Sequence, residues 1–110
     1  MSVYLVAMVR VEDPETYKQY TGRTPAIISK HGGRFLVRGG PVETIEGPTF
    51  DRRLVVLEFP SREAYHAFRN SPEYQEAMVF RQASSEGTFL LAEGVPEGTT
   101  APEDQVVKSG

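Results

Sequence analysis

The two histidines of this sequence are the side chains best suited to move a proton near neutral pH. His31 precedes Gly32 at the expected end of a helix, where the negative end of the helix dipole favours a charged imidazole. His31 is therefore the candidate catalytic acid or base. The alternative is that its ring only bonds the last carbonyls of that helix. His66 lies among polar residues of a short surface helix, where a solvated role is expected.

Arginines in the second expected strand suggest an anion site. Strict alternation along a strand places Arg34 and Arg38 on the face opposite to Phe35 and Val37. Guanidinium groups suit bidentate binding of a carboxylate or an enolate-like oxygen, so both arginines are candidate substrate-binding residues. Glu58 shares this face by the parity of its own strand, and as a second catalytic candidate it could orient a partner. The alternative is a structural ion pair between Arg38 and Glu58.

Three tyrosines at helical spacing are further candidates for binding a substrate. Tyr17, Tyr20 and Tyr74 could place hydroxyl groups over a cleft, where they would orient a ligand or donate a proton. Aromatic residues at this spacing also form cores, in which case each buried hydroxyl only needs a hydrogen-bond partner.

Composition excludes several other chemistries. The chain has no cysteine, so it has neither disulfides nor thiolate nucleophiles, and two histidines without a spacing motif predict no metal site. Axial haem ligation by one histidine stays open, but no cofactor is expected. The net charge of -3 disfavours binding to nucleic acid. The glycine pairs Gly32-Gly33 and Gly39-Gly40 flank a strand and do not open a helix, as a phosphate-binding loop would.

These residues are positioned by a predicted order of strand, helix, strand, strand, split helix and strand. A first helix should start at Asp13-Pro14-Glu15, break near Gly22 to Pro25, and end at Gly32. Two later helices should be capped by Ser61 and by Ser71. The predicted strands are 3–11, 33–38, 54–59 and 88–93, with a short edge continuation over 42–46.

This order fits a ferredoxin-like antiparallel sheet (βαββαβ, class α+β) with the first and third strands in the middle and the helices on one face. Both faces of the two central strands are apolar, whereas one layer of helices covers only one face. We therefore expect a homodimer in which the uncovered faces of two sheets pack together. The alternative is that the C-terminal tail folds back over this face.

The 110 residues amount to one domain, expected over residues 1–95, followed by a flexible tail over 96–110 that is rich in proline, glycine and acidic residues. The apolar N-terminal run is too short to cross a membrane and has no basic segment before it. A cytoplasmic protein with no membrane partner is the default expectation.

Several segments together resemble the DUF1330 family, whose function is unknown, over nearly everything from Val3 to Val95. The segments that carry the resemblance are 4–11, Asp13-Pro14 with Tyr17 and Tyr20, 31–40, 57–61 and 71–74. The family is similar to the dimeric α+β barrel group, which includes small monooxygenases, decarboxylating or isomerising enzymes and haem-handling proteins. The resemblance implies a ferredoxin-like dimer and no agreed activity, because one fold hosts many chemistries.

Two functional classes follow. The first is a small cofactor-independent enzyme that acts on a small anionic or carbonyl-containing metabolite, with His31 moving a proton, Arg34 and Arg38 holding the anion, and Glu58 orienting a partner. The second is a non-catalytic ligand-binding or interaction module. A cavity where His31, Arg38 and a tyrosine converge would favour the enzyme, and a closed, salt-bridged interface would favour the module.

Overall fold

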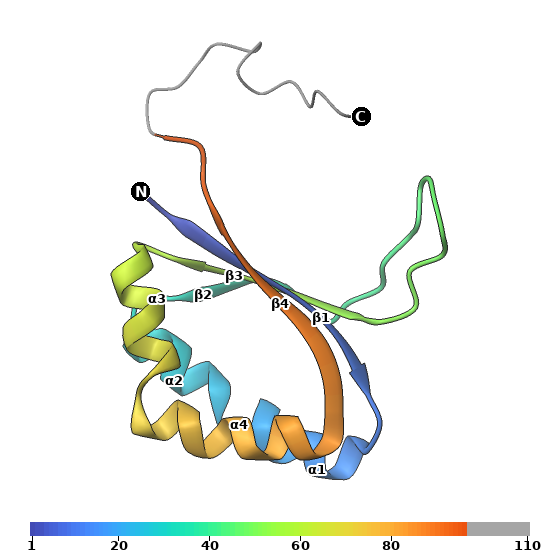
Figure 1. The fold of residues 1–110 in the computed structure, drawn as a ribbon, viewed down its shortest axis with the longest axis horizontal. Coiled ribbons are helices and arrows are strands. Elements are labelled where there is room, and N and C mark those ends of the chain that lie inside the picture. Colours follow the sequence, from blue (N-terminus) through green and yellow to red (C-terminus); the bar gives the residue numbers. More distant parts are fainter. Residues whose placement is uncertain (97–110) are drawn as a thin grey trace.

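The computed structural model describes residues 1–96, and within this range the chain forms four strands and four helices (Figure 1). The predicted tail over 96–110 lies outside the described residues, apart from Pro96. The elements in chain order are β1 (Val3–Val11), α1 (Pro14–Thr21), α2 (Thr24–Lys30), β2 (Arg34–Arg38), β3 (Arg53–Phe59), α3 (Arg62–Arg69), α4 (Pro72–Ser84) and β4 (Ser85–Glu93).

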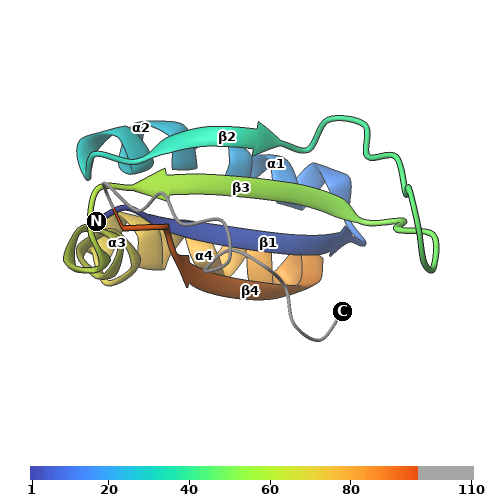
Figure 2. The same cartoon turned by 90° about the horizontal axis from the view of Figure 1, so that it is seen from above.

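The strands form one antiparallel sheet in the order β2-β3-β1-β4, so the first and third strands lie in the middle as predicted. All four helices lie on one side of this sheet, and the other side carries no helix (Figure 1). Seen from above, the strands lie in front of the helices (Figure 2). The ferredoxin-like α+β fold predicted from the sequence is confirmed.

The helix starts follow from side-chain caps. The side chains of Asp13, Ser61 and Ser71 each accept a hydrogen bond from the backbone N–H three residues later, which satisfies an otherwise unpaired donor of the first turn. The first helical segment breaks between α1 and α2, with Pro25 in the first turn of α2, as its missing N–H requires. The predicted starts and the predicted break are confirmed.

The core lies between the sheet and the helices. Phe59 on β3 is fully buried and packs against the rings of Tyr65 and Phe68 from α3, at centroid distances of 5.5 and 5.1 Å. Gly33 leaves room for this ring, because a Cβ there would lie 2.6 Å from the Phe59 Cε1 atom. Alternate residues of β1 from Val3 to Val9 complete the floor of this core.

Strict alternation fails in β2. The register shifts between Phe35 and Val37, so that Val37 lies opposite Val56 and Arg38 lies opposite Val55. One extra residue in a strand moves every later side chain to the other face. Our prediction that Arg38 shares a face with Arg34, opposite Phe35 and Val37, is therefore wrong beyond Phe35.

Two strand boundaries also differ from the prediction. Residues 42–46 form no strand in the structure, and belong instead to a long connection from β2 to β3. β4 begins at Ser85, three residues before the predicted start, immediately after α4. The side chains of Ser84 and Ser85 both bond the Arg81 carbonyl, which fixes this abrupt change from helix to strand.

The helix-free face of the sheet holds partly buried apolar side chains. Val6 and Met8 from β1 and Leu54 and Val56 from β3 are half-buried, and Leu90 on β4 is 52% exposed. None of the helices in the described part of the chain is long and apolar enough to cross a membrane.

Candidate functional site

Glu58 is the centre of a polar network on the helix-free face. Arg34 Nε and Nη2 both lie 2.7 Å from Glu58 Oε1, and Tyr4 Oη donates to Glu58 Oε2 at 3.2 Å. The paired positions Arg34↔Glu58 and Tyr4↔Glu58 on adjacent strands explain the contact. The structure thus pairs Glu58 with Arg34, where we expected Arg38, because the irregularity in β2 turns Arg38 to the other face.

The network keeps its carboxylate charged. The Arg34 guanidinium lowers the pKa of Glu58, with smaller contributions from hydrogen bonds to Ser2 and Tyr4. The same hydrogen bond raises the pKa of Tyr4, because a charged phenolate beside a carboxylate is disfavoured. The Glu58 side chain is 19% exposed and Arg34 is 71% exposed, so solvent screens this pair.

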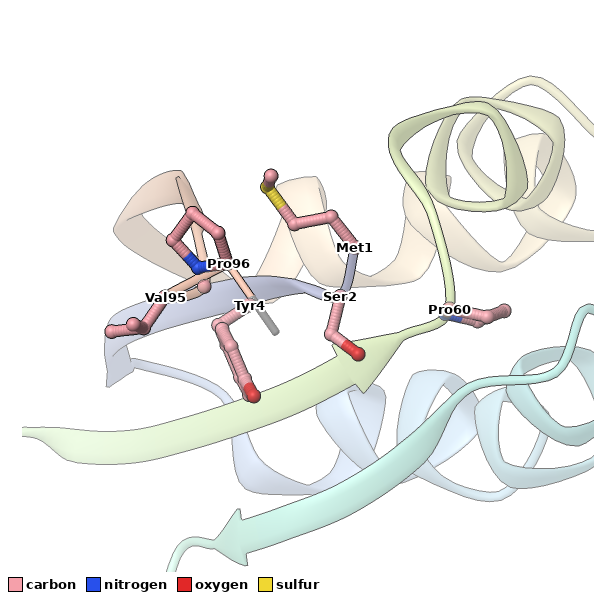
Figure 3. Close-up of a pocket in the computed structure, with 7 residues that line it drawn as sticks. Met1, Ser2, Tyr4, Pro60, Val95 and Pro96 are labelled. Atoms are coloured by element: carbon pink, nitrogen blue, oxygen red, sulfur yellow. The ribbon is translucent and has the colours of Figure 1, made fainter. Parts of the chain in front are cut away.

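Two open hollows adjoin this network. One, of about 190 Å³, is lined by Ser2, Gly32, Arg34, Glu58 and Pro60. The other, of about 460 Å³, shares Ser2 and Pro60 and is bounded by Tyr4 and by residues from both ends of the described chain, namely Met1, Gly94, Val95 and Pro96 (Figure 3). Both hollows lie at an edge of the surface that has no helix over it.

His31 lies elsewhere. Its Nδ1 is 2.9 Å from the Ile27 carbonyl oxygen, which can only accept, so Nδ1 carries the proton and bonds the end of α2. Its ring packs edge-on against that of Phe68, with the ring centroids 6.1 Å apart. His31 lines none of the hollows described here, so the structure does not bring it together with Glu58 or Arg38.

Arg38 is also apart from these groups. Its guanidinium carbon lies 4.4 Å from the centroid of the Phe35 ring, a stacking contact at the end of β2. The convergence of His31, Arg38 and a tyrosine that would favour the enzyme is therefore not seen in the described residues. The roles predicted for His31, Glu58, Arg34 and Arg38 stay predictions.

A second candidate site lies inside the molecule, between the sheet and the helices. The hydroxyl groups of Tyr20 from α1 and Tyr74 from α4 form a hydrogen bond, with their oxygen atoms 2.9 Å apart. The ring centroid of Tyr17 lies 5.6 Å from that of Tyr20. The pair borders a cavity of about 30 Å³ whose other lining residues are almost all apolar: Leu5, Ala7, Thr24, Ile28, Phe35, Val55, Leu57, Phe68 and Phe89.

Burial decides the chemistry of these hydroxyls. It raises the pKa of Tyr20 strongly, with further contributions from the neighbouring Tyr74, so Tyr20 is a neutral hydrogen-bond donor across the physiological range. Two phenols that bond one another use only one of their two O–H groups. One O–H of the pair is thus not used by this hydrogen bond.

Two arginines near these tyrosines were not singled out from the sequence. Arg81 on α4 is 9% exposed and Arg53 on β3 is half-buried, and the Nε atom of each is buried without a hydrogen-bond partner. Arg81 follows Tyr74 by seven residues and Ala77 by four, so it continues the buried face of α4. A charged residue at a position where the helical repeat is otherwise apolar is the sequence signal that could have identified Arg81. No group of three or more acidic or histidine side chains that could hold a metal occurs within residues 1–96.

Comparison with known families accounts for nearly all of the described chain. The domain of unknown function DUF1330 matches residues 2–95, so the chain belongs to the DUF1330 family. The resemblance noted from the sequence is confirmed. No curated protein matches the chain.

Solved structures with similar folds confirm the ferredoxin-like architecture. A protein of unknown function from Rhodopseudomonas palustris is similar over 86% of this chain and 83% of its own, with 20% identity and a TM-score of 0.72. A dimeric ferredoxin-like protein of unknown function from Jannaschia covers 86% and 100%, with 17% identity and a TM-score of 0.67. SnoaB, a cofactor-independent oxygenase from Streptomyces nogalater, covers 90% and 98%, with 15% identity and a TM-score of 0.64. At these identities the likeness establishes the fold.

Proposed function

We propose that the cavity between sheet and helices binds a small, mainly apolar molecule through one carbonyl or hydroxyl oxygen. The observation that carries this proposal is the hydroxyl pair of Tyr20 and Tyr74, two residues that line an otherwise almost entirely apolar cavity and whose mutual hydrogen bond uses only one of their O–H groups. Ligand sites combine an apolar lining with few, well-placed polar groups, and this cavity has that character. The open hollows beside Glu58 lack an enclosing apolar wall.

Ligand entry requires the cavity to expand. A volume of about 30 Å³ holds one or two water molecules and excludes a metabolite. The short helix α2 supplies Thr24 and Ile28 to the cavity wall. The side chain of its N-cap residue, Arg23, makes no capping hydrogen bond to the first turn. Outward movement of α2, hinged at the break after α1, would open the cavity.

The protein is further proposed to act as a homodimer through the helix-free face. The half-buried apolar residues of this face would lose their remaining exposure against a second sheet, which stabilises association. The dimeric neighbour from Jannaschia supports this arrangement. Size-exclusion chromatography with light scattering should give twice the chain mass at micromolar concentration, and a monomer there would contradict the proposal.

Binding is tested with benzamide, a neutral probe that has an apolar ring and a carbonyl oxygen. An NMR titration should shift resonances of cavity residues, and either Tyr20→Phe or Tyr74→Phe should weaken binding by about fivefold, the worth of one hydrogen bond. Tyr4→Phe, which alters only the helix-free face, is the matched control. Shifts confined to residues around Glu58 would refute the cavity as the site.

A cofactor-independent enzyme is the second candidate. The likeness to the oxygenase SnoaB favours it, and a buried phenol pair can stabilise an oxyanion that develops on a bound substrate. His31 remains the predicted proton carrier, through the ring Nε2 that its bond to Ile27 leaves free. For any substrate that is found, Tyr20→Phe should lower kcat if the pair stabilises an oxyanion. His31→Ala should abolish turnover with little change in Tm if the imidazole is catalytic.

A further inference from the structure

Arg81 is 9% exposed, and the Nε atom of its guanidinium is buried without a hydrogen-bond partner among residues 1–96. The ion pairs closer than 4.0 Å among residues 1–96 include Arg10, Arg34 and Arg62, but neither Arg81 nor Arg53. The paired arginines all lie in more exposed positions, where water would solvate them without a partner. Within the described part of the chain, the most deeply buried arginine is thus one of those without a counter-ion.

Arg81 does not itself line the proposed ligand cavity, but it packs against two residues that do. Its guanidinium carbon is 4.2 Å from the centroid of the Phe89 ring and 5.8 Å from that of Tyr20, and both rings line the cavity. Contacts with ring faces offset part of the cost of burying this charge. They do not engage its in-plane N–H groups, and the Nε atom stays unpaired.

Arg53 approaches the same cluster from the sheet. Its guanidinium carbon is 5.8 Å from the centroid of the Tyr17 ring, and Tyr17 packs on Tyr20. Burial raises the pKa of Tyr17, whereas both Arg53 and Arg81 act to lower it, so the two cations lie close to the same phenol. Two guanidiniums and three phenols therefore form one cluster, and Tyr20 and Tyr74 are the members of this cluster that line the cavity.

We propose that the ligand of this cavity is a carboxylic acid, whose carboxylate binds Arg81 with help from Arg53 and whose apolar body occupies the cavity. This inference rests on the proposed function and specifies its ligand class. A planar guanidinium can donate two parallel hydrogen bonds to a carboxylate, which supplies both the missing counter-ion and the missing acceptor. Tyr17 and the Tyr20–Tyr74 pair provide further O–H donors within the same cluster.

The test compares benzoate with benzamide, which has nearly the same shape but no charge. Near neutral pH, NMR titration should give an affinity for benzoate about tenfold higher than that for benzamide, with a large shift of the Arg81 Nε–H resonance. In Arg81→Met the two affinities should become equal, because the apolar wall remains and the cation is lost. Arg62→Met, which removes an exposed arginine paired with Glu93, is the matched control and should keep the preference.

The outcomes separate this inference from the proposed function. Equal affinities for the two probes in the wild-type protein would overturn the carboxylate assignment and leave the cavity site standing. Binding of neither probe would overturn both. If Arg81→Met fails to fold, Arg53→Met takes its place and should lower the benzoate preference severalfold, and an unchanged preference there contradicts the shared anion site. Without ligand, Arg81→Met should unfold at a higher temperature than the wild type, since a buried, unpaired charge is removed.

Discussion

The two faces of the sheet have similar apolar residues but different surroundings. On the helix side, Leu57 and Phe59 are buried, whereas Val56, which precedes Leu57 in the sequence, lies half-buried on the helix-free face. The two faces also differ in how the charges of their polar groups are balanced. Tyr4 on the helix-free face bonds a carboxylate that an arginine already balances, whereas Tyr20 on the helix side bonds only another phenol, near a guanidinium without an anion.

This comparison indicates what each face still lacks. The helix-free face is balanced in charge at Glu58 but incomplete in packing, and a second sheet would complete it. The helix side is packed around a small cavity and is unbalanced in charge at Arg81, and an acidic ligand would balance it. Association and ligand binding are thus assigned to opposite faces of one sheet.

The largest expected effect is the difference in stability loss between two truncations in β3, one on each face of the sheet. Phe59→Ala should lower the free energy of unfolding by about 3–5 kcal/mol, because it removes a fully buried ring from the core. Val56→Ala, three residues earlier and on the other face, should cost about 1 kcal/mol in a dilute sample. Urea denaturation measures both. Equal losses would remove the distinction between the faces.

A charge on the helix-free face should prevent association. Leu90→Glu places a carboxylate on β4, which the second copy repeats by symmetry, and should raise the dimer dissociation constant by about a hundredfold. Val79→Glu is the control, because Val79 is similarly exposed, at 61% against 52%, but lies on α4. Light scattering after dilution would detect the change. Dissociation by Val79→Glu alone would place the interface on the helices instead.

The smallest effect should be the loss of the Glu58 network's contribution to stability at acid pH. Arg34 lowers the folded-state pKa of Glu58, so the network's contribution to stability is present above the unfolded-state pKa of about 4.5 and is lost as the pH falls through the folded value. Glu58→Gln should therefore flatten the decline of Tm in acid. Glu63→Gln, an exposed acid on α3, is the control. If Tm in Glu58→Gln declined in acid as it does in the wild type, the Arg34–Glu58 pair would contribute nothing to stability.

Much of the fold could be predicted from local chemistry. Asp13, Ser61 and Ser71 are caps because their side chains reach the third backbone N–H onward, and Pro25 breaks the first helix because it has no N–H to donate. These are interactions between near neighbours, so the sequence alone determines them. The β-branched and large apolar residues of β1 likewise determined a strand with apolar side chains on both faces.

The candidate site was only partly predictable. The sequence pointed to Tyr17, Tyr20 and Tyr74, but only the packing of α1 on α4 joins the hydroxyls of Tyr20 and Tyr74 and buries Arg81 behind them. The extra residue in β2 turned Arg38 away from Glu58 and left Arg34 as its partner. Register, long-range pairing and the burial of a charge depend on which distant segments meet, and no local pattern encodes them.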